Sequence, residues 1–568
     1  MFLSTHTLHK YITKTSKGVG HSMKNLYNDW LQSSNYKEEL QSILTTQEIT
    51  DRFYQYVPFG TGGMRGKLGA GTNRINIHTI RLVAEGLARH IAGQGDAARN
   101  RGVVIAYDTR HFSQQFAYET ASVLAKHGIK SYVFKESRPT PLLSFAVRYF
   151  SAAAGVVITA SHNPKQYNGF KVYGEDGSQL TPLFADEIVA HMEMIHNIFD
   201  IQALSLEELF LSDLCVEILD EIDQAYIEAL NCFTTLGEKD LRVVYTPIHG
   251  AGLVPTVRAL QSAGFEQLYI VEEQAVQSGE FPTVLYPNPE EADAFQLAMK
   301  LGEQVHAEVL LATDPDADRL GVAVLDGEYR LLTGNQLGAL LLNYLLETKP
   351  ISPNAAVVKT IVTSEFGTAI ANKYGISTVN TLTGFKYITE KIAEWEETKE
   401  HSFLFGYEES YGYLAGDFVR DKDAVQIALL TAEMAAHYKK QNKSLLDVLN
   451  ELYEELGSYK EALVSLTFDG VEGQQKIASI MENIRKNPPE YFAQTEVIKI
   501  EDYKDGNVNG LPTADVIKLL LADDSWICIR PSGTEPKCKF YIGVKRGTVE
   551  ESDKAITLYK EAVRDLYE

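Results

Sequence analysis

Cysteine is scarce in this sequence, and the few cysteines present are far apart. There are 4 in 568 residues, at positions 215, 232, 528 and 538, and no two of them form a C-x-x-C pair. This spacing argues against a disulfide scaffold and against a cysteine-based zinc site. It is typical of a protein in a reducing compartment, so we expect a cytoplasmic location.

Basic residues and long apolar runs are also in short supply. Lys and Arg number 53 against 76 Asp and Glu, a formal net charge of −23. A general binder of nucleic acid or anionic membranes would need a basic face, so neither partner is expected. The apolar run 337–346 is interrupted by Asn343, and it is shorter than the roughly 18 residues of a membrane span.

Residues 1–22 lack Asp, Glu and Arg, and they contain no continuous apolar segment. A secretory signal needs such a segment, and a transit peptide is usually rich in Arg, so the composition favours neither. We interpret these residues as a disordered extension. The catalytic protein is expected to begin near Met23, where MKNLYNDWLQ opens an amphipathic helix.

Most of the chain alternates short β-rich runs with amphipathic stretches. Hydrophobic residues make up 45% and charged residues 23% of the sequence, as in ordinary globular proteins, and the length suggests about three to five domains. The alternation is the signature of α/β domains. The strands expected here are 103–107, 155–159, 241–245, 308–313 and 356–360, and the helices are 113–127, 255–263 and 364–374.

One pattern occurs three times: a helix ends in Gly-Ile or Gly-Phe, and a strand follows at once. The glycines are Gly128, Gly264 and Gly375, each suited to a left-handed helix cap. Three copies predict three similar α/β units. The last 110 or so residues lack the regular alternation and predict a smaller α+β domain. The expected divisions are 1–39, 40–225, 226–331, 332–455 and 456–568.

The segment DPDADR provides the sharpest chemical signal. Asp314, Asp316 and Asp318 stand between two strand-like runs, and three carboxylates so close repel each other unless a cation holds them. Oxygen-only ligands favour a hard cation, most plausibly Mg²⁺. A calcium EF-hand is excluded, because its glycine and glutamate positions are occupied by Arg319 and Leu325. The end of a strand is also where α/β proteins place their sites.

Two further segments follow predicted strands. TASHNP places Ser161 on a loop, a good position for a nucleophile, although no G-x-S-x-G elbow is present. RPSGTEPK, which begins at Arg530, combines a guanidinium, two hydroxyls and a glycine, and such groups suit a phosphate dianion. Lys539 adds a further cation.

Two glycine-containing loops complete the set. GTGGMRGK around Arg65 lacks the spacing and the final Ser/Thr of an ATP-binding P-loop, but it can still bring Arg65 to a phosphate. GYEESYG places Glu408 and Ser410 two residues apart. A carboxylate and a hydroxyl at this spacing can bind adjacent sugar hydroxyls.

Together, these five segments resemble those of the α-D-phosphohexomutase family, and most of all those of its bacterial phosphoglucomutases. The resemblance extends from about residue 40 to the C-terminus, in the family's order, and TASHNP and DPDADR are highly specific as a pair. It implies three similar α/β domains plus a smaller α+β C-terminal domain around a central cleft.

The resemblance also implies roles for individual residues. Ser161 would carry the transferable phosphoryl group, and a phosphoserine oxygen would join Asp314, Asp316 and Asp318 around Mg²⁺. Glu408 and Ser410 would bind the sugar 3- and 4-hydroxyls. The basic residues around the phosphoryl group would be Arg65, His162, Lys171 and Lys386; the other substrate contacts would be Arg319, Thr383, Gly384, Arg530, Ser532, Gly533, Thr534 and Lys539. Lys539 stands where relatives often have arginine, and its ammonium is a point charge rather than a bidentate fork.

The implied activity interconverts glucose 1-phosphate and glucose 6-phosphate through glucose 1,6-bisphosphate, which would also act as activator. Ribose, deoxyribose and mannose 1-phosphates stay open as substrates, since Tyr407 gives a GYEE form that phosphopentomutase-like relatives share. Outside the family, an aspartyl-phosphate phosphatase is the alternative, although its usual Thr or Val is here Asp318. A non-catalytic carbohydrate binder would be expected to have lost Ser161 or an aspartate. The expected partners are small sugar phosphates, and the expected state is a monomer or weak homodimer.

Overall fold

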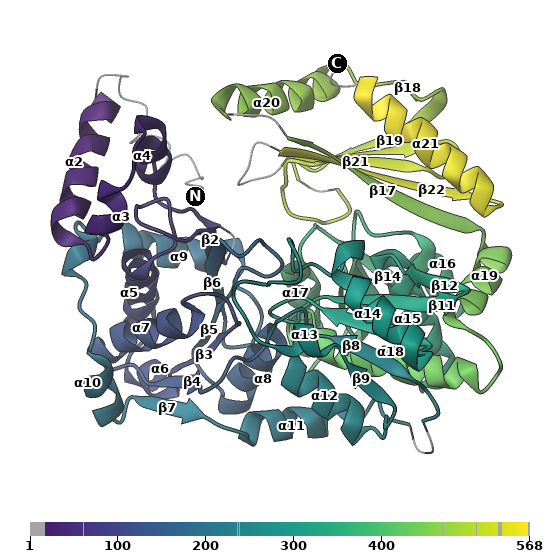
Figure 1. Cartoon of the computed structure of the whole chain (residues 1–568). Coiled ribbons are helices and arrows are strands. Elements are labelled where there is room, and N and C mark those ends of the chain that lie inside the picture. Colours follow the sequence, from purple (N-terminus) through teal and green to yellow (C-terminus); the bar gives the residue numbers. More distant parts are fainter. Residues whose placement is uncertain are drawn as a thin grey trace. The chain divides into compact units, whose positions relative to one another are not determined.

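The computed structural model describes residues 18–60, 62–235, 237, 239–467, 470–506, 508–531 and 537–565. They form two compact units (Figure 1). Unit 1 holds the chain up to Ile222 together with Gln277–Pro287; unit 2 holds Asp223–Val276 and the chain from Asn288 onward. Residues 1–17 of the predicted extension lie outside the described residues. Among the described residues, the first helix is α2 (Gly18–Ser33), which begins ahead of Met23.

Three helices near the start of the described chain pack on the body of unit 1: α2, α3 (Lys37–Gln41) and α4 (Thr46–Phe53). Trp30 of α2, Leu40 of α3 and Phe53 of α4 are all buried in one apolar cluster with Leu82 and Val123. Burying a large apolar side chain contributes about 1.5–3 kcal/mol. These helices therefore belong to the folded body of unit 1.

The main sheet of unit 1 has seven strands in the order β1-β2-β6-β5-β3-β4-β7. The strands are β1 (Phe59–Gly60), β2 (Gly63–Lys67), β3 (Val103–Tyr107), β4 (Ser131–Phe134), β5 (Ala154–Ile158), β6 (Tyr167–Tyr173) and β7 (Cys215–Ile218). The helices are α5 (Ile77–Gly93), α6 (Asp96–Arg101), α7 (Ser113–Lys126), α8 (Thr140–Phe150), α9 (Pro182–Glu193) and α10 (Leu206–Leu211), with the 3₁₀ turn η1 (Ile198–Asp200). β3 and β5 are buried along their whole length, which explains their continuous apolar sequences.

Unit 2 contains two further α/β sheets, ordered β12-β11-β10-β8-β9 and β14-β13-β15-β16. The first comprises β8 (Val243–Thr246), β9 (Leu268–Ile270), β10 (Val309–Thr313), β11 (Leu320–Asp326) and β12 (Glu328–Leu331), with α11 (Glu221–Leu230), α12 (Leu253–Ser262), α13 (Glu272–Ala275) and α14 (Ala292–Val305). The second comprises β13 (Ala355–Thr360), β14 (Ser377–Thr381), β15 (Ser402–Glu408) and β16 (Gly412–Leu414), with α15 (Gly334–Thr348), α16 (Phe366–Lys373), α17 (Phe385–Thr398), α18 (Ala424–Lys439) and α19 (Leu445–Leu456).

The three sheets share one four-strand plan, as the repeated pattern predicts. In each, a first strand (β3, β8, β13) pairs in parallel with a second (β4, β9, β14) and a third (β5, β10, β15). A fourth strand (β6, β11, β16) runs antiparallel to the third. Gly128, Gly264 and Gly375, ahead of the second strands, have φ of 68°, 88° and 70°. The predicted left-handed caps are therefore confirmed.

The C-terminal region is a six-stranded antiparallel sheet, ordered β17-β22-β21-β20-β19-β18, with two helices (Figure 1). Its elements are β17 (Ser458–Thr467), α20 (Gly470–Lys486), β18 (Tyr491–Phe492), β19 (Thr495–Asp502), β20 (Ile517–Leu521), β21 (Trp526–Pro531), β22 (Lys537–Arg546) and α21 (Val549–Asp565). Met481 of α20 and Val563 of α21 share an apolar cluster with Ile529 and Phe540 of the sheet. The expected α+β domain is confirmed. Within the described part of the chain, no helix combines the length and the apolar character needed to cross a membrane.

Candidate active site

Three of the predicted motif segments occupy the same topological position. Each connects the third strand of a sheet to the fourth: 159–166 after β5, 314–319 after β10, and 409–411 after β15. Each also holds one residue other than glycine in the left-handed region: Ser161 (φ 51°), Ala317 (φ 43°) and Tyr411 (φ 64°). Such residues cost about 1–3 kcal/mol each and persist only where their surroundings hold them, as at binding and catalytic loops.

Hydrogen bonds to other residues of unit 1 fix the position of the Ser161 loop. The Ser161 N–H donates to Thr159 Oγ1 over 2.9 Å, and Thr159 Oγ1 donates to Asp108 Oδ2 over 2.7 Å. Ser161 Oγ lies 3.2 Å from His162 Nδ1, close enough for a hydrogen bond. Only 5% of Ser161 is exposed. The hydroxyl therefore has a defined position beside a ring that can exchange a proton with it.

Two predicted cations lie on the strands beside this loop. In the pairing of β2 with β6, Arg65 is opposite Gly169 and Gly63 is opposite Lys171, so Arg65 and Lys171 are diagonal neighbours on one face of the sheet. Arg65 Nη1 also donates to Asn163 Oδ1 in the serine loop, over 2.9 Å. The structure thus places both cations side by side on two paired strands, β2 and β6, and β6 directly follows the loop that carries Ser161.

The aspartate loop in unit 2 gathers three buried carboxylates. Asp314, Asp316 and Asp318 are 0%, 0% and 2% exposed, and each offers an oxygen within 4.8 Å of the others. Asp314 Oδ1 accepts the N–H groups of Asp318 and Arg319, both over 3.1 Å. Buried carboxylates at this spacing repel one another strongly, and an all-oxygen donor set fits a hard divalent cation such as Mg²⁺.

The segment that connects β8 to α12 supports the aspartate loop. The Ala251 N–H donates to the Pro315 carbonyl over 2.8 Å. A Cβ on Gly250 would lie 2.5 Å from Pro315 Cα, so only glycine permits this close approach. The carboxylates therefore project from a backbone that is fixed before any cation binds.

Lys422, just before α18, lies beside the aspartates. It was not predicted as a site residue from the sequence. Its Nζ is 3.3 Å from Asp318 Oδ2 and 2.9 Å from Asp421 Oδ1. Burial alone would lower the pKa of Lys422, but the carboxylates of Asp318, Asp421 and Glu408 raise it well above the usual value. Lys422 therefore stays protonated and offsets part of the negative charge of the loop.

The aspartate loop is joined to the 409–411 loop within unit 2. The Leu320 N–H donates to the Tyr411 carbonyl over 3.1 Å, and Arg319 and Gly412 form an isolated β-bridge. Glu408 is 6% exposed, and burial raises its pKa although Lys422 and Arg319 act in the opposite direction. The Arg319 Nη1 also contacts Glu290 Oε1 at 2.8 Å. The two loops thus form one continuous structure that places Glu408 next to cations.

Four further predicted contacts lie at the start of α17 and on the C-terminal sheet. Gly384, with φ of 125°, is the residue before α17, and Lys386 lies in its first turn. Burial lowers the pKa of Lys386 to about 8. Arg530 and Lys539 face each other across β21 and β22, and burial and Arg530 lower the pKa of Lys539. Ser532, Gly533 and Thr534 lie outside the described residues.

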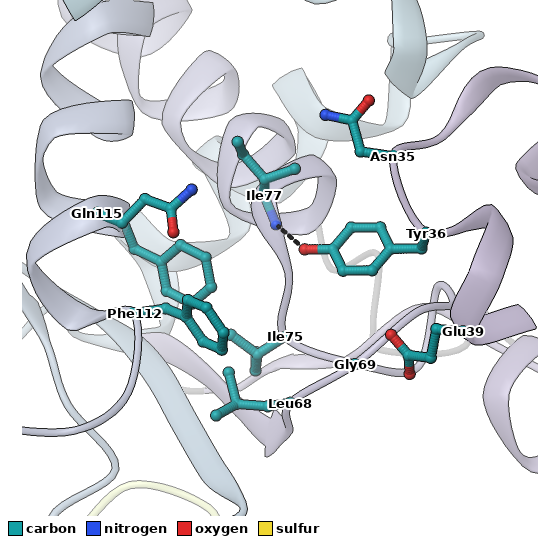
Figure 2. A pocket seen from close by; sticks show the side chains of 10 residues that line it. Asn35, Tyr36, Glu39, Leu68, Gly69, Ile75, Ile77, Phe112 and Gln115 are labelled. Atoms are coloured by element: carbon teal, nitrogen blue, oxygen red, sulfur yellow. Dashed lines mark hydrogen bonds between the residues drawn. The ribbon is translucent and has the colours of Figure 1, made fainter.

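Unit 1 also contains a cavity of about 360 Å³ between α3, the segment 68–77 and α7. Figure 2 shows Tyr36, Glu39 and Gln115 directed toward it, with Leu68 below. The Tyr36 hydroxyl accepts the Ile77 N–H over 3.4 Å (Figure 2). None of the predicted site residues that the structure describes lines this cavity.

Three family models match the chain along most of its length. They are described as the alpha/beta/alpha domains I, II and III of phosphoglucomutase/phosphomannomutase, and they cover residues 57–198, 224–327 and 333–456. The chain belongs to this family. The α-D-phosphohexomutase resemblance predicted from the motifs is therefore confirmed.

Similar family members are known at the level of sequence and structure. A phosphoglucomutase of Staphylococcus haemolyticus is 39% identical over 549 residues, which cover 94% of this chain and 98% of that one. A Staphylococcus aureus phosphoglucomutase is 39% identical over 513 residues, covering 88% and 91%. The solved structure of the Paramecium phosphoglucomutase parafusin superposes with a TM-score of 0.66 at 18% identity, covering 89% of this chain and 94% of that one. This last likeness shows the shared fold.

Proposed function

We propose that this family member interconverts α-D-glucose 1-phosphate and glucose 6-phosphate, with Ser161 as the phosphoryl carrier. One observation carries the proposal: the chain combines a serine whose backbone is fixed by a hydrogen bond, on the β5–β6 loop, with three buried aspartates on the β10–β11 loop. Phosphoryl transfer needs both a group that carries the phosphoryl and a cation that balances its charge. The phosphoglucomutase relatives at 39% identity support glucose as the sugar.

The reaction consists of two phosphoryl transfers. In the first, O6 of glucose 1-phosphate attacks the phosphorus of phospho-Ser161; the P–O6 bond forms, the P–Oγ bond breaks, and the proton moves from O6 to Oγ overall. The bisphosphate then turns over. In the second, Ser161 Oγ attacks the 1-phosphate; its P–O1 bond breaks, and the proton passes from Oγ to O1. Glucose 6-phosphate leaves, and the phosphoenzyme is restored.

The chain's own cations contribute to both transfers. The transition state spreads negative charge over three phosphoryl oxygens, so positioned cations lower the barrier. Arg65, Lys171 and His162 would supply this charge around Ser161, and Lys386 would add to it. Asp314, Asp316 and Asp318 would hold Mg²⁺ with a phosphoserine oxygen; the ion would neutralise charge on the transferring group.

The sugar phosphate would be bound by two groups of residues, one that recognises its hydroxyls and one that recognises the phosphate that is not being transferred. Glu408 and Ser410 would bind the 3- and 4-hydroxyls in both orientations of the bisphosphate. The group that would hold the non-reacting phosphate comprises Arg530, Lys539, Ser532, Gly533 and Thr534, and contacts from Arg319, Thr383 and Gly384 would complete the site. Glucose 1,6-bisphosphate would rephosphorylate Ser161 and so act as activator.

We also propose the four-domain division 40–225, 226–331, 332–455 and 456–568, each domain contributing one of these loops. The protein would act in the cytoplasm on small sugar phosphates, as a monomer or weak homodimer.

A direct comparison of substrates tests the proposal. We would measure kcat/KM for glucose, mannose and ribose 1-phosphates with Mg²⁺ and the matching bisphosphate, and follow phosphate release in parallel. We expect glucose 1-phosphate to be the best substrate, with isomerisation far faster than phosphate release. A higher kcat/KM for ribose 1-phosphate would instead indicate a phosphopentomutase, and dominant phosphate release would indicate a phosphatase.

A further inference from the structure

A buried arginine lies directly beneath the serine loop. The Arg110 side chain is fully buried, and its two Nη atoms donate to four backbone carbonyls, three in that loop and one on Tyr167, the first residue of β6. Nη2 reaches Ser161 O at 2.5 Å and also Asn163 O, while Nη1 reaches Pro164 O at 2.9 Å and Tyr167 O at 3.1 Å. A single planar guanidinium thus supplies the donors that a helix or sheet would otherwise give these carbonyls.

Asp108 fixes the orientation of this guanidinium. Its Oδ2 lies 3.2 Å from Arg110 Nε, and its Oδ1 accepts the Arg110 N–H over 2.9 Å and the Ser113 hydroxyl over 2.8 Å. The same carboxylate accepts the Thr159 hydroxyl, whose oxygen in turn accepts the Ser161 N–H. Asp108 and Arg110 therefore contact the loop at both its start and its body, and neither contact involves the Ser161 hydroxyl.

A segment from elsewhere in the sequence closes over Arg110. Residues 277–287 follow α13 of the second sheet but belong to unit 1; we call them the arm. The Phe281 ring centroid lies 4.9 Å from Arg110 Cζ, and Phe281 is 2% exposed with φ of 45°. A Cβ on Gly279 would lie 2.6 Å from the His111 nitrogen, so this close contact requires glycine.

The arm also bridges the two chain segments that flank Arg110 and Ser161. The Glu280 carboxylate contacts His111 Nε2 at 2.7 Å and Lys165 Nζ at 2.6 Å. Gln277 Oε1 accepts the Ser137 hydroxyl over 3.1 Å. The arm therefore encloses a cation–π contact from which water is excluded, the setting in which such contacts are strongest.

We propose that Arg110, shielded by Phe281 of the arm, is a positioning residue for phosphoryl transfer at Ser161. Arg110 holds the loop carbonyls so that Ser161 Oγ stays aligned with the incoming sugar hydroxyl. A displacement of about 1 Å at a reacting centre can cost about a hundredfold in rate, so loss of this support slows transfer although no reacting atom is removed. The proposal rests on the proposed phosphoserine mechanism.

The test measures single-turnover reactions of the phosphorylated enzyme. Wild-type protein and the Arg110→Lys variant are phosphorylated with labelled glucose 1,6-bisphosphate, and phospho-Ser161 is counted so that misfolded molecules do not contribute. The rate of transfer to glucose 1-phosphate and the rate of hydrolysis by water are then measured per phosphorylated site. Arg110→Lys keeps the charge but loses the planar fork.

We expect Arg110→Lys to slow transfer to the sugar about 30- to 100-fold, while hydrolysis changes less than threefold because water is small and needs little alignment. The ratio of transfer to hydrolysis therefore falls, an effect that a purely structural role would not produce. Arg148→Lys is the matched control, since Arg148 also donates to a backbone carbonyl, that of Asp176, away from the serine loop. It should leave the ratio unchanged.

An unchanged ratio in phosphorylated Arg110→Lys overturns the proposal. If that variant does not fold, Phe281→Leu decides, because it retains Arg110 and removes only the aromatic cap. We expect it to lower the ratio severalfold, and an unchanged ratio there is equally contradictory. If wild-type protein forms no phospho-Ser161 at all, the proposed function itself is wrong, and this result is distinct from both of the others.

Discussion

The serine loop of unit 1 and the aspartate loop of unit 2 have the same place in the same four-strand plan, yet they bear opposite charge. Around Ser161 the structure gathers cations, Arg65 on β2 and Arg110 beneath the loop. Around Asp316 it gathers carboxylates, with the loop backbone held by N–H groups and by the approach of Gly250. The fold thus fixes where a loop projects, while the residues of the loop and those packed around it decide its chemistry.

The largest decrease in kcat is expected when the serine loop loses the hydroxyl of Ser161. Ser161→Ala removes the phosphoryl carrier, so kcat should fall by roughly 10⁴-fold or more, as for other enzymes that lose a nucleophile. Ser479→Ala, on the exposed side of α20, is the control and should keep full activity. Substantial mutase activity of Ser161→Ala, measured with saturating bisphosphate, would show that the loop is not the phosphoryl carrier.

Removing one negative charge from the aspartate loop should lower kcat and weaken Mg²⁺ binding. Asp316→Asn removes one of three buried carboxylates, and loss of comparable transition-state electrostatics costs about 10²–10³ in kcat. The Mg²⁺ concentration for half-maximal activity should also rise. Asp326→Asn, at the exposed end of β11, should change neither quantity. Wild-type kcat and Mg²⁺ dependence in Asp316→Asn would refute the metal assignment.

Glu408, the last residue of β15 before the third equivalent loop, should affect sugar recognition. Glu408→Gln keeps the shape but loses a charge-assisted hydrogen bond of about 1.5–3 kcal/mol, which corresponds to about tenfold to a hundredfold in kcat/KM. The loss should appear in both reaction directions, since the bisphosphate presents the same hydroxyls after it turns. Glu400→Gln, an exposed neighbour in sequence, is the control. If only a pentose phosphate activity declines, glucose is the wrong substrate.

The smallest effect is expected from Lys386, whose pKa is lowered to about 8 by burial. Its ammonium form predominates below that pH; as the pH rises above about 8 the side chain becomes neutral and no longer attracts a phosphate. kcat/KM should therefore decrease by up to about tenfold per pH unit on the alkaline side. Lys386→Arg stays protonated and should flatten this decrease. Identical pH profiles for the two proteins would exclude Lys386 as the responsible group.

Much of the fold and the core of the site could be predicted from the sequence because their signals are local. The position of Gly128 directly after a helix predicts a left-handed cap. The spacing of Asp314, Asp316 and Asp318 is enough to bring three carboxylates together in one turn. The three copies of the Gly-capped pattern predicted three α/β units, the family resemblance agreed with that number, and the family models confirm it.

The parts of the site that the sequence did not predict depend on contacts between segments far apart in sequence. Lys422 reaches Asp318 only because β16 and the start of α18 lie beside the aspartate loop. Arg110 belongs to a short YDTRH segment that looks like an ordinary turn, and Phe281 reaches it through the arm. No local periodicity distinguishes such residues, because tertiary packing alone gives them their partners.

The most direct test of the account is to find which oxygen carries the phosphoryl group. The protein is incubated with bisphosphate labelled on phosphorus, the labelled peptide is mapped, and its stability to hydroxylamine is measured. We predict label on Ser161 that resists hydroxylamine and passes to sugar when glucose 1-phosphate is added. Hydroxylamine-sensitive label on Asp314 or Asp316, with Ser161 unlabelled, would contradict the account and indicate aspartyl-phosphate chemistry instead.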